Sequence, residues 1–445
     1  MRFIPVTCDE QSAMLDVVGV ESVDELFADV PQAARLERPL SLPEPMGEVE
    51  LSAHLKELAR ANRGADDVVS FLGGGCYDHY VPAIVDAVVS KPAFFTAYTP
   101  YQPEVSQGTL QAVYEYQSMI CQLTGMEVSN ASIYDGATAF AEAALMAARI
   151  TKRGRVVVSG AAHPEWRATL ATYVQAGTVT VTEVASTGGV SDVTALTAAL
   201  GDDVAAIMVA SPTFYGRLED LATLAELAHG AGALLVVGTN PILLGVMEPP
   251  ATFGADIVVA EGQPLGNPMS FGGPGLGIFA CRQAHIRQMP GRVAGRTTDV
   301  DGKTGFVLTF STREQHIRRE KATSNICSNH ALNALAAGVY LAAVGAAGLE
   351  GIAGACVAKA HYLEEALVAT GRFERVHSAP FGHEFALRYP GDVAEMQRAL
   401  LGAGFLAGLD LGRFSPDGAG LVLFAVTEKR TRAELDRFVE EVSAL

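Results

Sequence analysis

The chain has 445 residues, 49% of them hydrophobic, and its 50 acidic and 32 basic residues give a formal net charge of −18. This composition suits a well-packed α/β protein of two or three domains and argues against a disordered chain. Because nucleic-acid binders carry a basic footprint, the acidic balance also argues against a nucleic-acid partner.

The N-terminal region predicts an arm, not a targeting segment. Residues 1–31 are acidic and contain no apolar core segment, so no secretory signal is expected. The six cysteines are scattered without a C-x-x-C pair, which is typical of thiols in a reducing compartment, and we expect a cytoplasmic protein. Short acidic helices are predicted after Asp9 and after Ser22, then a Pro-rich linker at 40–47 and a helix from Ser52.

The centre of the chain alternates apolar runs with helical patterns. The predicted strands cover 156–159, 178–184, 204–209, 234–237, 257–260 and 276–280, and the helices between them cover 166–175, 192–200 and 220–230. Continuous apolar strands separated by helices predict a buried, mostly parallel sheet. Ligands of such sheets lie beyond the carboxyl ends of the strands, where this sequence places its polar residues.

The C-terminal part has a different pattern. The Ala/Gly-rich stretch 331–358 is interrupted by Asn333, Glu350 and repeated glycines, so a packed helix pair is expected and no membrane span. Beyond it, helices at 354–370, 394–403 and after Thr431, with strands at 385–389 and 421–426, predict a small α+β domain. We therefore predict an arm and linker at 1–69, a large domain at 70–347 and a small domain at 348–445.

Three short segments have the chemistry of a cofactor site. Asp135, Gly136 and Thr138 open an Ala-rich helix, where backbone N–H groups attract phosphate, although an ordinary helix cap gives the same pattern. His163 follows a strand and could stack on a flat cofactor, or could simply open a helix. Asn240 ends another strand, where pyridoxal enzymes often place an aspartate beside the pyridine nitrogen, and an amide cannot supply that carboxylate.

Two further segments combine rigid or charged groups. Residues 94–108 hold Tyr98 and Tyr101 close to two prolines, which can fix the two hydroxyls in place, or can form a packed surface strap. Residues 311–327 concentrate basic side chains among acids. Such a run is usually a solvated helical face, but it could equally be a docking or ligand-contact segment.

Seven segments together resemble the P-protein family of the glycine cleavage system. The match is to the N-terminal half, which many bacteria encode as a separate subunit 1, the α chain. The matching segments are SFLGGGCYDHYVP, TAYTPYQPEVSQGTLQAVYEYQ, YDGATAFAEA, AAHPEWR, GADIVVAEGQPLG, SFGGPGLG and TREQHIRREKATSNIC.

The resemblance implies an α/β pyridoxal-phosphate transferase of fold type I, with a seven-stranded type of sheet and a small C-terminal domain. It implies a partner, subunit 2, which carries the Schiff-base lysine and binds the pyridoxal phosphate, usually within a heterotetramer of two αβ units. The implied activity is glycine dehydrogenase (aminomethyl-transferring): glycine loses CO2, and its aminomethyl group passes to the lipoyl group of the H-protein.

In the catalytic member of the family, the loop after the strand at 257–260 carries a His-Lys pair, and this chain has Gln263 and Pro264 there. Proline cannot form a Schiff base. We therefore interpret these two residues, with Asp135, Gly136, Thr138, His163 and Asn240, as relics of a cofactor site. Tyr98 and Tyr101, with Thr99 and Gln102, are predicted to complete the partner's site at the interface.

Two alternatives remain at this point. An autonomous pyridoxal enzyme would need a lysine, and Lys303 and Lys321 are the nearest candidates among the seven lysines. A scaffold subunit with no part in the site would tolerate changes throughout the Tyr98 segment.

Overall fold

The computed structural model describes residues 6–96, 98–177, 179–326 and 328–445. Two compact units emerge, one ending at Arg63 and one covering Gly64–Leu445. The boundary predicted after residue 347 remains a prediction.

The N-terminal unit contains two α-helices without a buried residue between positions 6 and 63. Helix α1 (Cys8–Val18) begins earlier than predicted because Thr7, not Asp9, caps it: Glu10 N–H donates to the Thr7 hydroxyl and Thr7 N–H to the Glu10 carboxylate. The predicted second helix is a 3-10 turn, η1 (Val23–Phe27), followed by η2 (Gln32–Ala34). Helix α2 (Glu48–Arg60) begins before Ser52, because the Glu50 carboxylate accepts the Gly47 N–H.

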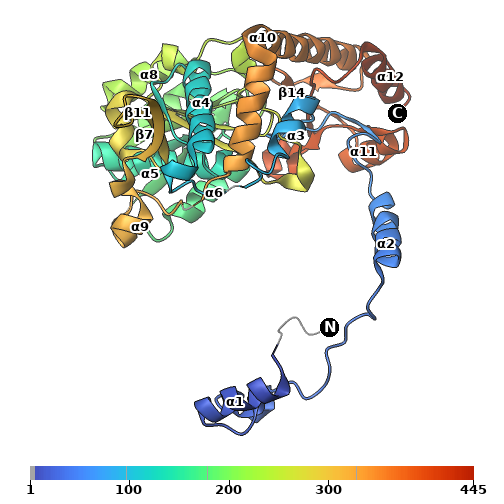
Figure 1. Ribbon diagram of the computed structural model, residues 1–445. Helices are drawn as coiled ribbons and strands as arrows, with labels where there is room; N and C mark the ends of the chain where they lie inside the picture. Colours follow the sequence, from blue (N-terminus) through green and yellow to red (C-terminus); the bar gives the residue numbers. More distant parts are fainter. Residues whose placement is uncertain (1–5, 97, 178, 327) are drawn as a thin grey trace. The chain divides into compact units, whose positions relative to one another are not determined.

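A seven-stranded sheet forms the centre of the second unit (Figure 1). Its order is β2 (Val128–Ser129), β10 (Gly277–Cys281), β9 (Ile257–Glu261), β8 (Leu234–Thr239), β7 (Val204–Ser211), β3 (Arg155–Ser159) and β4 (Thr180–Val184). Strand β10 is antiparallel to both neighbours and the other pairings are parallel. The predicted mostly parallel sheet is confirmed.

Helices cover both faces of this sheet, because alternate residues of each buried strand point to opposite sides. Val157, Ile207 and Val237 pack with α4 (Gln107–Thr124), α7 (Val193–Ala199), α8 (Leu221–Gly230) and α10 (Ala331–Ala369). Val156, Met208 and Val236 pack with α5 (Gly136–Thr151) and α6 (Pro164–Val174). The remaining short elements are α3 (Ala83–Val89), η3 (Pro103–Val105), η4 (Leu243–Gly245), η5 (Pro250–Phe253), η6 (Ser270–Gly272), η7 (Gln283–Gln288) and the hairpins β5 (Ser186–Thr187)–β6 (Val190–Ser191) and β11 (Val293–Thr298)–β12 (Thr304–Thr309).

The predicted helix pair in the apolar stretch is confirmed: the element labelled α10 consists of two helical segments joined by a sharp bend, visible in Figure 1. Gly345 makes the bend, with a φ of 61° that interrupts the helical backbone. Among the described residues, α10 is the one helix long and apolar enough to cross a membrane by length and composition. It packs on α3, α4 and α12 (Arg432–Ser443).

The C-terminal part of this unit is built on a four-stranded antiparallel sheet, with the order β13 (Glu374–Arg375), β14 (Glu384–Arg388), β17 (Leu421–Ala425) and β16 (Leu409–Asp410). Helices α11 (Val393–Gly402) and α12 complete it, with turns η10 (Leu411–Arg413) and η11 (Pro416–Gly418). Strand β1 (Val69–Ser70) pairs with β15 (Phe405–Leu406), and Phe71 joins the same apolar core. The Gly-rich loop after β1 is therefore tied to the C-terminal part before it reaches the large sheet.

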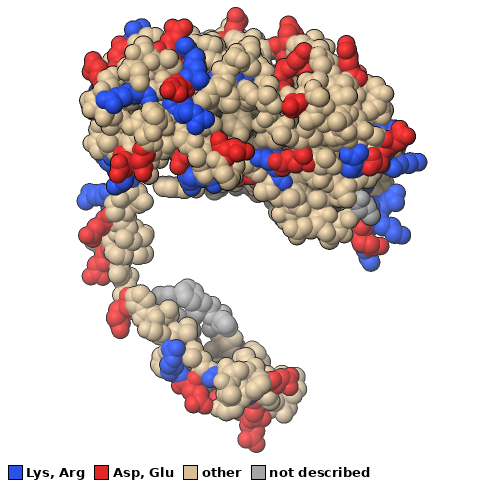
Figure 2. Space-filling model, turned by 180° about the vertical axis from the view of Figure 1, so that it is seen from behind, with Lys and Arg blue, Asp and Glu red and all other residues tan. Residues whose placement is uncertain are grey.

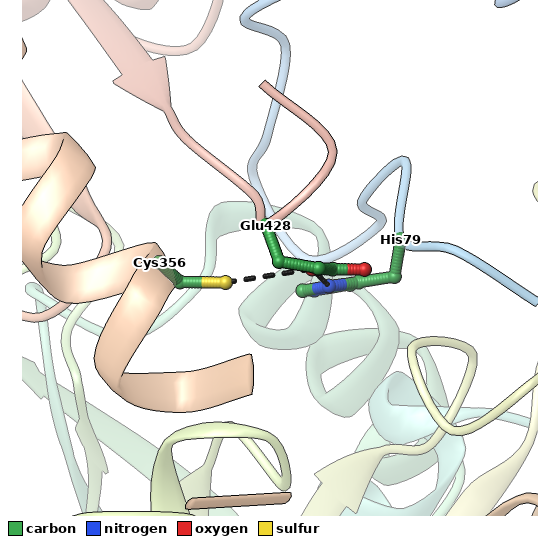
Figure 3. A group of neighbouring side chains, drawn as sticks. All are labelled: His79, Cys356 and Glu428. Carbon is green, nitrogen blue, oxygen red and sulfur yellow. Dashed lines mark hydrogen bonds and ion pairs between the residues drawn. The ribbon is translucent and has the colours of Figure 1, made fainter. Parts of the chain in front are cut away.

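Glu428 joins three segments of this unit (Figure 3). Its Oε2 lies 2.6 Å from Nδ1 of His79, in the Gly-rich loop, and 3.5 Å from Sγ of Cys356, on α10. Burial opposes ionisation of this carboxyl, but the hydrogen bond and charge of His79 lower its pKa to about 2. The 2.6 Å separation is that of a charge-assisted hydrogen bond, and two ligands of one Zn²⁺ ion would stand farther apart. We interpret this group as a structural contact that holds the three segments together.

Candidate functional site

The carboxyl ends of the parallel strands converge on two neighbouring cavities. The first has a volume of about 60 Å³ and is lined by residues that include His163, Trp166, Asn240, Glu261 and Glu384. The second, of about 170 Å³, shares His163, Trp166 and Glu261 and adds Asp135, Glu165 and Gln263. The structure thus brings together Asp135, His163, Asn240 and Gln263, as the sequence predicted for a relic site.

A carboxylate of the chain itself occupies the N-terminus of α5, where phosphate binding was considered. Asp135 caps the helix by accepting the Thr138 N–H at 2.7 Å. The Gly136 N–H donates to Glu261 Oε2 at 2.9 Å. Glu261 Oε1 accepts the N–H groups of Gln263 and Leu276, both at 2.9 Å. Three backbone donors that could hold a phosphate therefore already hold an internal anion.

The electrostatics around this carboxylate also disfavour a phosphate. Burial raises the pKa of Glu261 to about 7, although its three backbone donors favour the ionised form. Asp135 and Glu165 line the same 170 Å³ cavity, and no Lys or Arg is among its described lining residues. A phosphate placed here would meet three carboxyl groups and no basic side chain.

The Trp166 side chain fills the space between α5 and β8. A Cβ added at Gly136 would lie 2.6 Å from Trp166 Cζ2, and one added at Gly238 would lie 2.7 Å from Trp166 Cζ3. Both positions therefore need glycine, because any side chain would collide with the indole. The 60 Å³ that remains is well below the roughly 150 Å³ of a cavity that admits a benzene ring. A pyridine ring does not fit in this first cavity, beside the Trp166 indole.

His163 opens a helix, which was one of the two roles considered for it, and stacking on a cofactor remains a prediction. It is the N-cap of α6, where its Nδ1 accepts the Glu165 N–H, and its Nε2 lies 2.6 Å from the Gly74 carbonyl. The ring stacks on Trp166 at a centroid distance of 6.0 Å. The flat group on which it stacks is thus a side chain of this chain.

Both ends of the Asn240 amide form hydrogen bonds within the protein. Its Oδ1 accepts the Ile242 N–H at 3.0 Å, which identifies Nδ2 as the donor toward His383 Nε2 at 2.9 Å. Burial lowers the pKa of His383 to about 3, so this imidazole is neutral and can accept that hydrogen bond. The amide connects β8 to the C-terminal part and cannot supply a carboxylate to a pyridine nitrogen.

Gln263, at the position of the family's His-Lys pair, also serves as a connector. Its side chain accepts the Tyr77 N–H at 2.9 Å and donates to the Asn267 carbonyl at 2.6 Å. Pro264 lies beside it in the buried turn after β9. None of the seven lysines is among the described lining residues of either cavity. Lys303 is 76% exposed in the β11–β12 turn, paired with Asp301.

Sequence reasoning missed three residues that define this site: Glu261, Trp166 and Glu384. A charged residue directly after a continuous apolar strand was a visible signal for Glu261. Glu384 gave none, because it comes from the C-terminal part, far away in sequence. Its buried carboxylate accepts the Gly74 N–H at 2.7 Å and the Tyr77 hydroxyl at 2.6 Å.

The Glu384 carboxyl predicts a pH-dependent stability. Burial raises its pKa from 4.5 to about 7, so on raising the pH the unfolded chain loses this proton before the folded chain does. Its contribution to stability is thus present below about pH 4.5 and falls until about pH 7. Glutamine does not titrate. The free energy of unfolding of Glu384→Gln, relative to that of the wild type, should therefore rise by about 2 kcal/mol between about pH 5.5 and pH 8. Urea unfolding at both pH values measures this, and a pH-independent difference would contradict it.

The Tyr98 segment is anchored by a buried ion pair. Arg292 lies 3.2 Å from Glu314, donates to the Tyr101 hydroxyl and places its guanidinium 5.0 Å from the Tyr101 ring centroid. Thr99 is buried with its hydroxyl 3.5 Å from that of Ser328, whereas Gln102 is exposed. Tyr98 is 70% exposed, so its hydroxyl is available to a partner. The catalytic role of both tyrosines remains a prediction.

Residues 311–327 do not form the helical face considered from the sequence. They fold as η8 (Ser311–Arg313), one helical turn α9 (Gln315–Arg318) and η9 (Arg319–Lys321), and Cys327 lies outside the described residues. Arg313 and Glu314 are buried, so part of the segment is structural.

Comparisons with known proteins agree with this architecture. A sequence profile of the family described as "Glycine cleavage system P-protein" matches residues 1–442. A protein of Moorella thermoacetica named "Probable glycine dehydrogenase (decarboxylating) subunit 1" is 50% identical over 439 residues, covering 99% of this chain and 98% of that protein.

Solved structures extend the comparison to the fold. An inhibitor-bound crystal structure of a glycine decarboxylase (P-protein) of the glycine cleavage system superposes with a TM-score of 0.89 at 44% identity, covering 100% of both chains. A glutamate decarboxylase of Lactobacillus brevis, 14% identical, shares the fold alone with a TM-score of 0.67 over 93% of this chain and 96% of its own. The fold is type I of the pyridoxal-phosphate enzymes, and the chain belongs to the P-protein family of the glycine cleavage system.

Proposed function

We propose that this chain is the non-cofactor subunit of a glycine dehydrogenase (decarboxylating). With a lysine-bearing subunit 2 it would decarboxylate glycine and pass the aminomethyl group to the lipoyl group of an H-protein. The observation that carries this proposal is the filled site: Glu261 occupies the anion position, Trp166 the ring position, and no described lysine reaches either cavity. The name "subunit 1" of its relatives supports a partner chain.

In this proposal pyridoxal phosphate is bound by the partner and supplies the electron sink for decarboxylation there. The residues of this chain do not fit the cofactor, so its contribution is positional. The Tyr98 segment is the part best suited to reach a partner's site, because it is exposed at Tyr98 and held by Arg292 and Glu314 behind it. We further propose a cytoplasmic complex of two such αβ units.

Borohydride reduction of the reconstituted complex tests where the cofactor is bound. Reduction fixes pyridoxal phosphate to the lysine that holds it, and peptide mapping then identifies the chain. We expect the label on the partner subunit alone. A label on Lys303 or Lys321 would instead support an autonomous pyridoxal enzyme.

The combined change Tyr98→Phe and Tyr101→Phe tests the contribution of the segment. We expect the complex to lose about tenfold or more in glycine–bicarbonate exchange, because hydrogen bonds that position reacting groups are each worth about that much. Tyr173→Phe, on α6, is the matched control because it removes a hydroxyl from another exposed tyrosine. Full activity of the double variant in an intact complex would favour the scaffold alternative.

A further inference from the structure

A third cavity, separate from the two cavities of the relic site, is lined by five basic side chains. It has a volume of about 340 Å³, and its charged lining residues are all basic: Arg149, Arg287, Arg313, Arg318 and Lys321. This is unexpected in a chain with 50 acidic and 32 basic residues. Figure 2 shows basic side chains gathered at the lower right, the end where α9 lies after the rotation from Figure 1.

The cavity has no described lining residue in common with the two cavities of the relic site. Arg149 lies in the last turn of α5, whereas the relic site is at the first turn of the same helix. With a rise of 1.5 Å per residue, the two ends are roughly 20 Å apart. The basic cavity is therefore a separate feature of the molecule.

None of these five cations forms an ion pair within the described part of the chain. Glu314 acts on Arg313 electrostatically, but its carboxylate is already paired with Arg292. Glu142 acts on Arg149 electrostatically, but burial raises the pKa of its carboxyl to about 7, which weakens it as a counter-charge. Like charges gathered in one cavity repel each other, and a bound anion would relieve that repulsion.

Two of the guanidinium groups are held in place with hydrogen-bonding capacity to spare. Arg313, which is 9% exposed, donates to the carbonyls of Met289 and Gly291, and Arg149 donates to the Gln288 carbonyl at 3.2 Å. The buried Nε of each has no partner among the described residues. The Phe310 ring lies 5.9 Å from both the Arg287 and Arg313 guanidinium groups, and the hydroxyl residues Thr312 and Thr323 complete the lining.

We propose that this cavity binds a phosphate-type dianion, either free phosphate or the phosphoryl group of a small phosphomonoester. Fixed guanidinium groups bind phosphate oxygens in pairs, and a lysine adds a point charge. The volume lies within the range of small-molecule sites and is ample for such a group.

Calorimetric titration of the full-length chain with inorganic phosphate in about 0.15 M KCl tests this site, because chloride at that concentration screens non-specific attraction. We expect saturable binding of one phosphate per chain. Arg287→Gln and Lys321→Gln change exposed residues and should leave folding intact, but each should weaken binding about tenfold through loss of one charge-assisted contact. Arg398→Gln, an exposed arginine on α11, should leave the affinity unchanged.

A parallel titration with glycerol 3-phosphate separates the two sources. Tighter binding than inorganic phosphate supports a phosphomonoester ligand, and weaker binding supports free phosphate. The proposal is overturned if the wild type shows no saturable phosphate binding, or if the double variant Arg287→Gln/Lys321→Gln binds phosphate as the wild type does.

Discussion

Replacing Glu261 by alanine should destabilise the chain by about 3 kcal/mol, because three backbone N–H groups would lose their acceptor at once. Two of these donors lie in turns that shape the site, and the third opens α5, so the loss should loosen the helix start and the loop after β9 together. Urea unfolding at about pH 8 measures the effect.

Glu261→Gln is the matched variant, since it keeps one carbonyl oxygen of the same reach. Its loss should be smaller than that of alanine, because some of the three donors keep an acceptor. Equal unfolding free energies for the alanine variant and the wild type would show that Glu261 is not the anion that holds this site together.

Restoring a lysine by Pro264→Lys should not restore cofactor binding in this chain. The amine would return to the loop after β9, but Trp166 and Glu261 would still occupy the ring and phosphate positions. We expect no imine absorbance when the variant is mixed with pyridoxal phosphate, and no lysine at position 264 labelled after borohydride reduction.

The variant that also carries Trp166→Ala and Glu261→Ser tests the physical reason. It removes the indole and the internal anion, and it leaves the Gly136 N–H at the start of α5 free for a phosphate. We expect this chain to bind pyridoxal phosphate at position 264. If Pro264→Lys alone forms the imine, the filled-site explanation is wrong, because the lysine would then be the only missing part.

The sheet could be predicted from sequence because its strands are continuous apolar runs, such as Val204–Ser211, separated by periodic helices. Four positions of the site could also be predicted, because each lies at or near the end of an element at the carboxyl edge of the sheet: Asp135, His163, Asn240 and Gln263. The side chains that fill the site could not be predicted. Trp166 was part of a recognised motif, but only the close approach of its indole to Gly136 and Gly238 reveals its role.

Contacts between distant segments limited the rest of the prediction. Glu384 reaches Gly74 and Tyr77 across more than 300 positions of the chain, and no local pattern encodes that meeting. The start of α1 was misplaced because two cap residues, Thr7 and Asp9, compete in the sequence and the capping box with Glu10 decides for Thr7. The basic segment at 311–327 was misjudged as a possible helical face because burial of Arg313 is a tertiary effect.

The central claim is that decarboxylation of glycine requires a partner subunit that carries the Schiff-base lysine. Glycine–bicarbonate exchange, in the presence of pyridoxal phosphate and a lipoylated H-protein, measures it most directly when each subunit is assayed alone and both are assayed together. We expect no exchange above background from this chain alone and full exchange only when it is combined with the lysine-bearing subunit. Exchange catalysed by this chain alone would contradict the account.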